Sequence, residues 1–300
     1  MIDTHVHYGT EAFAQDLPAV MAQDQEAGIE KVLCLPITYE DNFSLAQRTE
    51  CWADSIKYAA GIHPLRVPQF PSGEDPSFSA AREADLCRRK IGILEEFLEM
   101  MNSLQKLIGS DPGRYAAVGE TGIDTHTDVG RNNLYMQKVS FREHIRLSQK
   151  NHLPLVLHLR GEDAFSQALS VMKNGQMANI HYRGVVHCFH GTMEDMEMML
   201  DGGRNDFVFG IGGMLTYPER GAVLRDTLRN APADADILSK LVLETDSPYL
   251  APQAKLKQGI TRNTAGCLTE VVPLIAELLS VPAAEVIRRT DENARRMFGL

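Results

Sequence analysis

The residues of this sequence best suited to chemistry are histidines and carboxylates at the ends of apolar runs. The chain opens with a β-prone run that ends in His5-Val6-His7. Side chains two residues apart on a strand point to the same side, so the imidazoles of His5 and His7 would converge on one point, as two metal ligands must. A His-x-His pair alone is a weak signal. It gains weight because four later strand-like runs also end in metal-ligand residues: Glu120, His158, His187 and Asp246.

Imidazole nitrogens and carboxylate oxygens are ligands for divalent cations such as Zn²⁺, Mn²⁺ or Mg²⁺. The glycines around Glu120 permit close backbone approach, and its carboxylate could bridge two cations with its two oxygens. Asp246 could bind a metal and take a proton from a water, whose pKa a metal lowers from about 16 to about 7. Glu244, two residues earlier, could orient a ligand from outside the metal site.

Four further residues each have two interpretations. His63 also ends an apolar run, although a lone histidine there is more often a hydrogen-bonded core residue. Arg160 follows His158 by two residues, and its guanidinium suits either a phosphate or a surface ion pair. His190 is either a substrate contact or a loop residue. Asp124 is better explained as a turn residue than as support for a ligand.

Eight short β-prone runs alternate with amphipathic helical runs along the chain. This alternation predicts parallel strands with helical crossovers, and eight such units close into a (β/α)8 TIM barrel, an α/β fold. The carboxyl ends of the strands would then gather the residues above around one mouth. An open doubly wound sheet is the alternative, but its usual Gly-rich phosphate turn does not follow the first run. The expected strands are Ile2–Val6, Lys31–Leu35, Tyr58–Ile62, Tyr115–Gly119, Leu155–Leu157, Gly184–His187, Phe207–Gly210 and Leu241–Glu244.

One segment is out of proportion to this pattern. Residues 65–118 separate the third expected strand from the fourth. Leu65–Phe78 is rich in proline and is expected to be an irregular loop, and Ala80–Gly109 is expected to be a helix. The segment could be a lid or substrate wall at the mouth, or an excursion without a role in the site. We predict one barrel domain over residues 1–300 that includes this extended segment.

The composition is that of an ordinary soluble globular protein, with 44% hydrophobic and 23% charged residues. The formal net charge of -10 argues against a broadly basic nucleic-acid-binding surface, although metal ions could make one site locally positive. Five cysteines without a C-x-x-C pair indicate reduced thiols and a cytoplasmic protein. Neither a signal peptide nor a membrane-spanning run is expected, and nothing indicates an obligate protein partner.

In combination, the motifs resemble those of the TatD-type metal-dependent deoxyribonucleases, a family of amidohydrolase-like TIM barrels. The likeness runs the length of the chain, and six motifs occur in the family's order. They are His5-x-His7, Gly61-Ile62-His63-Pro64, Gly119-Glu120-Thr121-Gly122-Ile123-Asp124, Leu157-His158-x-Arg160, His187-Cys188-Phe189-x-Gly191-Thr192 and Glu244-Thr245-Asp246-Ser247-Pro248-Tyr249.

The resemblance implies hydrolysis of phosphodiester bonds in DNA or a nucleotide substrate, often stepwise from a 3′ end. Two cations about 4 Å apart suit this reaction because they can hold the attacking and the leaving oxygen of an in-line displacement. Asp246 and Glu120 would be the catalytic residues, and His63 and Arg160 would face the phosphate. The implied ligands are His5, His7, Glu120 and Asp246 at one metal, and Glu120, His158 and His187 at the other.

The sequence departs from the family pattern at three places. Thr264-Ala265 follows Arg262-Asn263 where Glu-Pro is usual, His190 replaces a usual serine, and the 65–118 segment is longer than usual. All three could touch the substrate. Two alternatives therefore stay open: an amidase, lactonase or small phosphoesterase on the same barrel, and a non-enzyme whose metals only stabilise it. Related barrels often bridge their metals with a carboxylated lysine on the fourth strand, and Glu120 at that position favours the nuclease.

Overall fold

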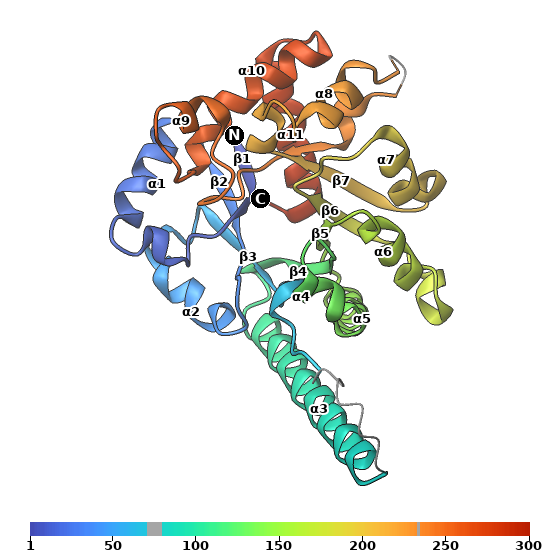
Figure 1. The fold of residues 1–300 in the computed structure, drawn as a ribbon. Helices are drawn as coiled ribbons and strands as arrows, with labels where there is room; N and C mark the ends of the chain where they lie inside the picture. Colours follow the sequence, from blue (N-terminus) through green and yellow to red (C-terminus); the bar gives the residue numbers. More distant parts are fainter. Residues whose placement is uncertain (71–79, 233–234) are drawn as a thin grey trace.

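The strands of this protein form a barrel in which neighbours in sequence are neighbours in space (Figure 1). The computed structural model describes residues 1–70, 80–232 and 235–300. All eight strands are parallel and pair in chain order. The expected (β/α)8 barrel is therefore confirmed. The strands are β1 (Ile2–Val6), β2 (Lys31–Cys34), β3 (Ile56–Ala60), β4 (Tyr115–Asp124), β5 (Leu155–Arg160), β6 (Arg183–His187), β7 (Asp206–Ile211) and β8 (Leu241–Leu243).

The first and last strands meet through backbone contacts just beyond β8. Val6 forms a parallel bridge with Ser247, and the amide of His7 donates to the carbonyl oxygen of Ser247 at 2.8 Å. The hydroxyl of Thr4 donates to the carbonyl oxygen of Leu243 at 2.9 Å. These bonds bring the carboxyl end of β1 beside the carboxyl end of β8, which is where the sequence places its first and last ligand-type residues.

Small and β-branched side chains fill the barrel interior, and the C-terminal helix closes its amino end. One cluster joins interior residues of every strand, such as Ile2, Val185 and Val242, to Met297 and Phe298 of the C-terminal helix. Arg183, the first residue of β6, donates to the carbonyl oxygen of Met297 at 2.8 Å. With the amino end of the barrel covered, the carboxyl end is left for a functional site.

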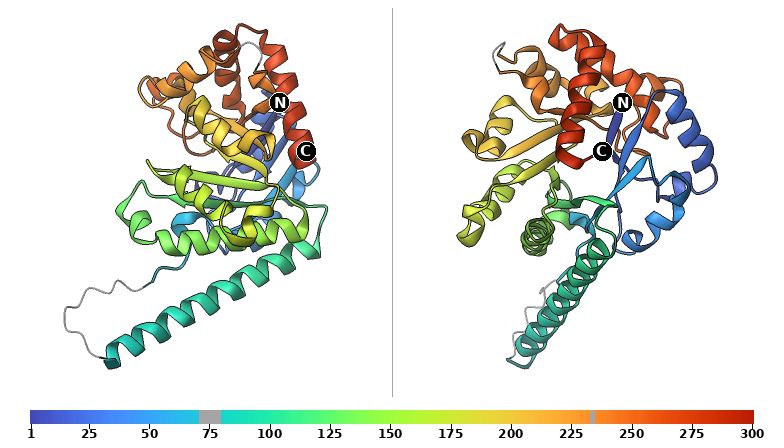
Figure 2. Two further views of the ribbon diagram at one scale, coloured as in Figure 1. Left: turned by 90° about the vertical axis from the view of Figure 1, so that its right-hand side faces the viewer. Right: turned by 180° about the vertical axis from the view of Figure 1, so that it is seen from behind.

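Helices surround the barrel and follow the strands (Figure 2). Ala80–Ser110 forms the long helix expected over Ala80–Gly109. The helices are α1 (Leu17–Glu26), α2 (Asp41–Arg48), α3 (Ala80–Ser110), α4 (Asp128–Asn132), α5 (Leu134–Asn151), α6 (Ala164–Met172), α7 (Met193–Leu200), α8 (Ala222–Arg229), α9 (Gln253–Lys257), α10 (Leu268–Leu279) and α11 (Ala283–Phe298).

Six of the eight strands end at a different residue from the one expected: β2 and β3 end earlier, at Cys34 and Ala60, and β5 and β7 end later, at Arg160 and Ile211. The changed ends of β4 and β8 bear on the site. β4 continues to Asp124 rather than ending at Gly119, because Thr121–Asp124 pairs with Leu157–Arg160 after a shift in register. Glu120 therefore lies inside the strand. β8 ends at Leu243, one residue early, so Glu244 and Asp246 lie in the connection that follows.

The extended segment between β3 and β4 holds a short 3-10 helix, Pro64–Arg66, and then α3. Phe97, Leu104 and Ile108 are buried, so the carboxyl-terminal half of α3 packs on the body of the protein. The other half extends outward from the side of the barrel (Figures 1 and 2). Most of the expected loop Leu65–Phe78 falls on residues 71–79, outside the described residues. A role as a lid stays a prediction.

Along the described ranges, no single helix is both long and apolar enough to cross a membrane. Only a pair of helices bent by 106°, Ala265–Leu279 with Ala283–Phe298, meets the length and composition required.

Candidate metal centre

The carboxyl end of the barrel gathers histidine and carboxylate side chains into one cluster. His5 lies on β1 and Glu120 on β4, while His158 and His187 lie on β5 and β6. Asp246 lies in the turn after β8. Every ligand-type residue expected at the mouth is in this cluster, because parallel strands deliver their carboxyl ends to the same end of a barrel. The members are His5, His7, His63, Glu120, His158, His187 and Asp246.

Four side chains face one another around the first possible metal position. Nε2 of His5 lies 3.2 Å from Nε2 of His7. Oε2 of Glu120 lies 3.6 Å from Nε2 of His5 and 3.8 Å from Nε2 of His7. Oδ1 of Asp246 lies 3.2 Å from Nε2 of His7 and 3.8 Å from Nε2 of His5. Such spacings suit ligand atoms that each stand about 2 Å from one divalent cation.

The other oxygen of Glu120 faces a second set of nitrogens. Oε1 lies 3.0 Å from Nδ1 of His158, 3.8 Å from Nε2 of His187 and 3.9 Å from Nε2 of His63. The carboxylate of Glu120 thus divides its two oxygens between two groups of imidazoles. The His5, His7 and Glu120 group and the His63, Glu120 and His158 group each have ligand atoms within 4.8 Å of one another.

Hydrogen bonds fix which ring nitrogens can bind a cation. The carbonyl oxygen of Leu35 accepts from Nδ1–H of His7 at 3.1 Å, which leaves the lone pair of a neutral His7 on Nε2, facing the cluster. In His158, Nε2 lies 3.0 Å from Oδ2 of Asp124, so Nδ1 is the nitrogen available to a metal. Nδ1 of His187 makes no hydrogen bond among the described residues, but Oε1 of Glu244 lies 3.0 Å from it at ion-pair distance, and Nε2 of His187 faces the cluster.

The same argument excludes His63 as a ligand. Its Nδ1 accepts a hydrogen bond from the amide of Leu65 at 3.1 Å. The proton of the neutral ring is therefore on Nε2, the nitrogen that faces Glu120, and Nε2–H is a donor. Burial lowers the pKa of His63 to about 4, which keeps the ring neutral near pH 7. His63 thus presents a hydrogen-bond donor toward the cluster, and its expected contact with a phosphate stays a prediction.

The cluster has a buried floor and a more open rim. The side chains of His5, His7, His187 and Glu120 are at most 4% exposed. Those of Asp246, His63 and His158 are 17%, 16% and 14% exposed. These three side chains are therefore the part of the cluster most accessible to solvent.

Mutual electrostatics hold the buried acids in their charged form. Burial alone would favour a neutral carboxyl, but the surrounding histidines, His63 and His5 foremost, keep the pKa of Glu120 well below its usual range. The hydrogen bond to His7 and the charge of His187 likewise lower the pKa of Asp246 against the effect of burial. Burial lowers the pKa of His158, but its hydrogen bonds to Asp124 and Glu120 have the larger effect and raise that pKa to about 8. Charged carboxylates and imidazole nitrogens together suit a divalent cation, which binds the neutral form of the ring.

Asp124 supports a cluster residue, which corrects its interpretation as a plain turn residue. Because β4 continues to Asp124, its buried carboxylate reaches Nε2 of His158. The amide of Asp124 donates to Oε1 of Gln137 on α5 at 2.6 Å, which holds this end of the strand in place. Carboxylates that orient imidazole ligands in this way are common around metal sites.

Glu244 occupies the expected supporting position at His187. Oε1 also accepts a hydrogen bond from the amide of Cys188, whereas Oε2 is buried without a partner among the described residues. A Cβ added to Gly210 on β7 would lie 1.9 Å from Oε2 of Glu244. The absence of a side chain at Gly210 therefore makes room for this carboxylate.

Backbone contacts hold the first and last cluster residues together. Asp246 has φ = 58°, in the left-handed region that aspartate tolerates better than most residues. Its amide donates to the carbonyl oxygen of His5 at 2.9 Å. Oδ1 of Asp3 accepts from the amides of His5 and Thr245 at 3.0 and 3.1 Å. The chain that follows β8 is thus tied to β1 at several points.

The remaining expected contact residues lie outside the metal-facing cluster. Arg160 is exposed at the end of β5, and its charge acts on Asp124. His190 is partly buried, and its Nδ1–H donates to the carbonyl oxygen of Cys188 at 2.9 Å, within its own loop. Contact of either side chain with a substrate stays a prediction.

Two buried residues that support the His63 strand end carried no signal in the sequence. Asn42 on α2 bonds both backbone groups of Gly61, at 3.0 and 2.8 Å. Nε2 of His144 on α5 accepts from the amide of Ile62 at 3.0 Å. No motif surrounds these residues, and their partners lie 19 and 82 positions away in the sequence.

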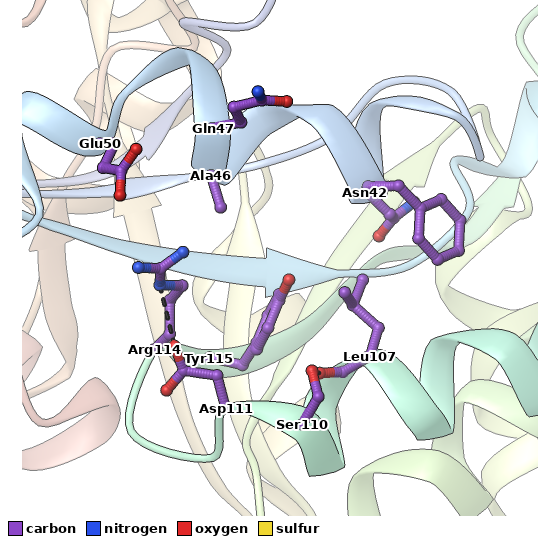
Figure 3. A pocket seen from close by; sticks show the side chains of 10 residues that line it. Asn42, Ala46, Gln47, Glu50, Leu107, Ser110, Asp111, Arg114 and Tyr115 are labelled. Atoms are coloured by element: carbon purple, nitrogen blue, oxygen red, sulfur yellow. Dashed lines mark hydrogen bonds and ion pairs between the residues drawn. The ribbon is translucent and has the colours of Figure 1, made fainter.

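A separate cavity of about 340 Å³ lies between α2 and the carboxyl end of α3 (Figure 3). Gln47 and Glu50 line one side, and Tyr115 and the ion-paired Arg114 and Asp111, 3.1 Å apart, line the other. None of its lining residues belongs to the cluster.

Comparisons with known proteins agree with the motifs and the fold. A curated relative from Pantoea ananatis, named 3′-5′ ssDNA/RNA exonuclease TatD, is 25% identical over the whole of both chains. The metal-dependent hydrolase YabD of Bacillus subtilis is 25% identical over 99% of this chain and 98% of its own.

Solved structures show the same barrel. The TatD homologue YJJV of Escherichia coli K12 has a TM-score of 0.75 at 25% identity, over 100% of this chain and 98% of its own. An amidohydrolase from Saccharomyces cerevisiae has a TM-score of 0.77 at 16% identity over 99% of both chains, which shows the fold alone. The family model of the TatD-related DNases matches residues 2–299, and the chain belongs to this family.

Proposed function

We propose that this protein is a divalent-metal-dependent phosphodiesterase that hydrolyses single-stranded DNA or RNA from its 3′ end. The observation that carries the proposal is the carboxylate of Glu120. Its Oε2 faces His5 and His7, and its Oε1 faces His158 and His187. A carboxylate in this position suits a bridge between two cations, and paired cations suit in-line displacement at phosphorus. The names of the curated TatD relatives support the same substrate class.

The ligand assignment is part of the proposal. His5, His7, Glu120 and Asp246 would hold one cation, and Glu120, His158 and His187 the other. Mg²⁺, Mn²⁺ and Zn²⁺ all accept these nitrogen and oxygen ligands. Cations held by these residues would supply Lewis acidity for the negative charge of a phosphoryl group.

The protein's own side chains would share the remaining work. The charged, partly exposed carboxylate of Asp246 accepts the proton of the attacking water. His63 donates Nε2–H to a phosphate oxygen, and the exposed guanidinium of Arg160 binds the phosphate from the rim. We further infer that residues 1–300 act as one barrel domain and that the protein is cytoplasmic, because its five cysteines contain no C-x-x-C pair.

A 3′-labelled single strand tests the proposal. Protein stripped of metal and then supplied with Mg²⁺, Mn²⁺ or Zn²⁺ should release labelled mononucleotide, and chelator should stop the release. Asp246→Asn should lower kcat at least 100-fold. The matched control is Asp226→Asn, which changes a carboxylate on α8 that is 69% exposed and should leave the rate unchanged. Folded protein that cleaves no strand with any of the metals would refute the nuclease.

Hydrolysis of a small phosphoester or lactone remains the alternative. The formal net charge of -10 favours it, because a polyanionic strand is repelled by a negative protein. A panel of small phosphodiesters, lactones and amides, assayed at the same metal concentration, distinguishes the two. Under the nuclease proposal, kcat/KM for the strand should exceed that for every small ester.

A further inference from the structure

One aromatic side chain stands exposed beside the metal-facing cluster. Tyr249 follows Asp246 by three residues, and its side chain is 49% exposed. Its amide donates to the carbonyl oxygen of Asp246 at 2.8 Å, which fixes the turn that carries both residues. The Tyr249 ring lies 6.0 Å from the ring of His7, centroid to centroid, at an angle of 63°. An open aromatic surface therefore borders the buried floor of the cluster.

Packing does not account for the position of Tyr249. Two other tyrosines differ from Tyr249 in using their hydroxyls inside the protein: Tyr8 donates to Asp24, and Tyr217 donates to the carbonyl oxygen of Ala251. Tyr135 on α5 is also exposed, at 63%, but is not part of the cluster. Across the residues that the structure describes, the hydroxyl of Tyr249 makes no hydrogen bond. Half of this side chain faces solvent although the protein interior is close by. Exposed aromatic rings at functional mouths are common contact surfaces for flat ligands.

Positive charges lie on the strand ends across the mouth. Arg66 follows β3 and Arg160 ends β5, and both side chains are exposed. Arg66 is close enough for its charge to act on the phenol of Tyr249. An aromatic ring on the β8 side and guanidinium groups on the β3 and β5 side match the two parts of a nucleotide, its base and its phosphate.

We propose that Tyr249 is a stacking platform for the nucleobase next to the cleaved bond. The proposal rests on the phosphodiesterase function proposed above and adds the group that the site recognises beyond the phosphate. Stacking uses the flat face that every base has, so the subsite should bind all four bases. A terminal sugar that lacks a base should bind more weakly. Tyr249 would thereby hold the terminal nucleotide while its phosphate lies over the cluster.

The test compares two strands that differ only in their last nucleotide. One carries a normal 3′-terminal nucleotide and the other an abasic sugar at that position. Wild-type protein should show a lower KM for the normal strand. Tyr249→Ala should raise KM for the normal strand by about 5- to 150-fold, the range found when a stacking aromatic is truncated, and should barely change KM for the abasic strand. Tyr249→Phe is the matched control and should behave as wild type, because the ring remains.

Two results would overturn the stacking subsite. Equal losses on both strands with Tyr249→Ala would show a structural role in the turn that holds Asp246. A Tyr249→Phe variant as impaired as Tyr249→Ala would show that the hydroxyl, and not the ring, makes the contact. Each variant's unfolding midpoint in urea is measured alongside, so that a misfolded variant is recognised.

Binding measurements separate this proposal from the proposed function. If wild-type protein cleaves neither strand, the phosphodiesterase proposal fails. Fluorescence anisotropy with both strands, with Ca²⁺ as the divalent ion, then reports the subsite directly. Tighter binding of the normal strand that Tyr249→Ala abolishes would support stacking. Equal binding of the two strands, or binding unaffected by Tyr249→Ala, would refute it.

Discussion

At the scale of single residues, what each histidine of the cluster can bind depends on which ring nitrogen carries the proton as much as on where the ring lies. His63 and His158 have ring centroids only 4.5 Å apart, yet their hydrogen bonds give them opposite capacities. The amide of Leu65 occupies Nδ1 of His63 and leaves a donor toward the cluster. Asp124 occupies Nε2 of His158 and leaves Nδ1 toward Glu120. This difference supports the roles proposed for them, His63 at the substrate and His158 at a metal.

The first prediction concerns Asp124. Asp124→Ala removes the acceptor that orients His158, and metal affinity should fall about 10- to 100-fold. Asp124→Asn is the matched control, since its carbonyl oxygen can still accept from Nε2–H and should recover most of the affinity. Titration of the metal-free protein with Mn²⁺ by calorimetry measures both variants. Equal affinity of Asp124→Ala and wild type would contradict the supporting role.

The second prediction concerns the pH dependence of stability through His144. Its Nδ1–H donates to the carbonyl oxygen of Ser140 at 2.8 Å, and its Nε2 accepts from the amide of Ile62. Burial lowers the pKa of His144 from 6.5 to about 4, so the folded protein resists a proton that the unfolded chain accepts. Neutral His144 therefore adds to the free energy of unfolding. This addition is fully present above pH 6.5 and decreases by up to about 3 kcal/mol as the pH falls toward 4.

Urea unfolding between pH 7.5 and pH 4.5 measures this effect. His63, with a pKa of about 4, acts in the same direction, so the comparison is made between wild type and His144→Gln. The variant should be less stable at pH 7.5 but should lose less stability on acidification. If the free energy of unfolding fell equally with pH in the two proteins, His144 would not remain neutral in the folded state.

At the scale of elements, β1, β4, β5 and β6 carry cluster residues, and β7 supplies space for a side chain that supports one of them. β7 contributes no metal-facing side chain, yet Gly210 on this strand leaves room for the carboxylate of Glu244. β4 contributes Glu120 and, through its extension, Asp124. The register shift between β4 and β5 brings Asp124 level with Arg160, so the extension of one strand depends on its neighbour.

The third prediction contrasts two glycines. Gly210→Ala should displace Glu244 from His187 and lower metal affinity about 10- to 100-fold, because the new methyl group occupies the space of Oε2. Gly92 on α3 has nothing within 4 Å of an added Cβ, so Gly92→Ala should leave affinity unchanged and stabilise the protein by about 0.5–1 kcal/mol. Mn²⁺ titration and urea unfolding measure the two effects. Unchanged metal affinity in Gly210→Ala would refute the packing argument.

At the scale of the whole molecule, the two ends of the barrel have separate tasks. The carboxyl end holds the polar cluster, and the amino end is closed by α11. Oδ1 of Asp291 on α11 accepts from the amide of Ile2 at 2.8 Å, and Asn293 donates to the carbonyl oxygen of Leu241 at 2.8 Å. The last helix is therefore bonded to the first residues of β1 and β8, and stability at this end can change without a change in the site.

The fourth prediction uses that separation. Met297 is 1% exposed in the barrel-interior cluster, so Met297→Ala should lower the free energy of unfolding by about 2–5 kcal/mol. Met198→Ala, at a position that is 39% exposed on α7, is the matched control and should change it by less than about 0.5 kcal/mol. Both variants should keep wild-type metal affinity under conditions where they are folded. A loss of metal affinity in Met297→Ala would show that the two ends are coupled.

The sequence by itself determined which residues meet at the mouth. Alternating strand and helix patterns predict a parallel barrel, and a parallel barrel brings the ends of its strands together whatever their separation in the chain. His5, Glu120 and Asp246 could therefore be grouped from their positions at strand ends alone. The TatD resemblance named the same residues from the motifs around them.

Only the tertiary structure decided how those residues face one another. The division of the Glu120 oxygens, the donor role of His63 and the support of His158 by Asp124 depend on side-chain hydrogen bonds. The space beside Gly210 and the anchoring of Ile62 by His144 depend on contacts between residues 34 and 82 positions apart in the sequence. Such contacts leave no periodic pattern in a sequence, because each is fixed by the packing of two distant elements rather than by the local conformation of either.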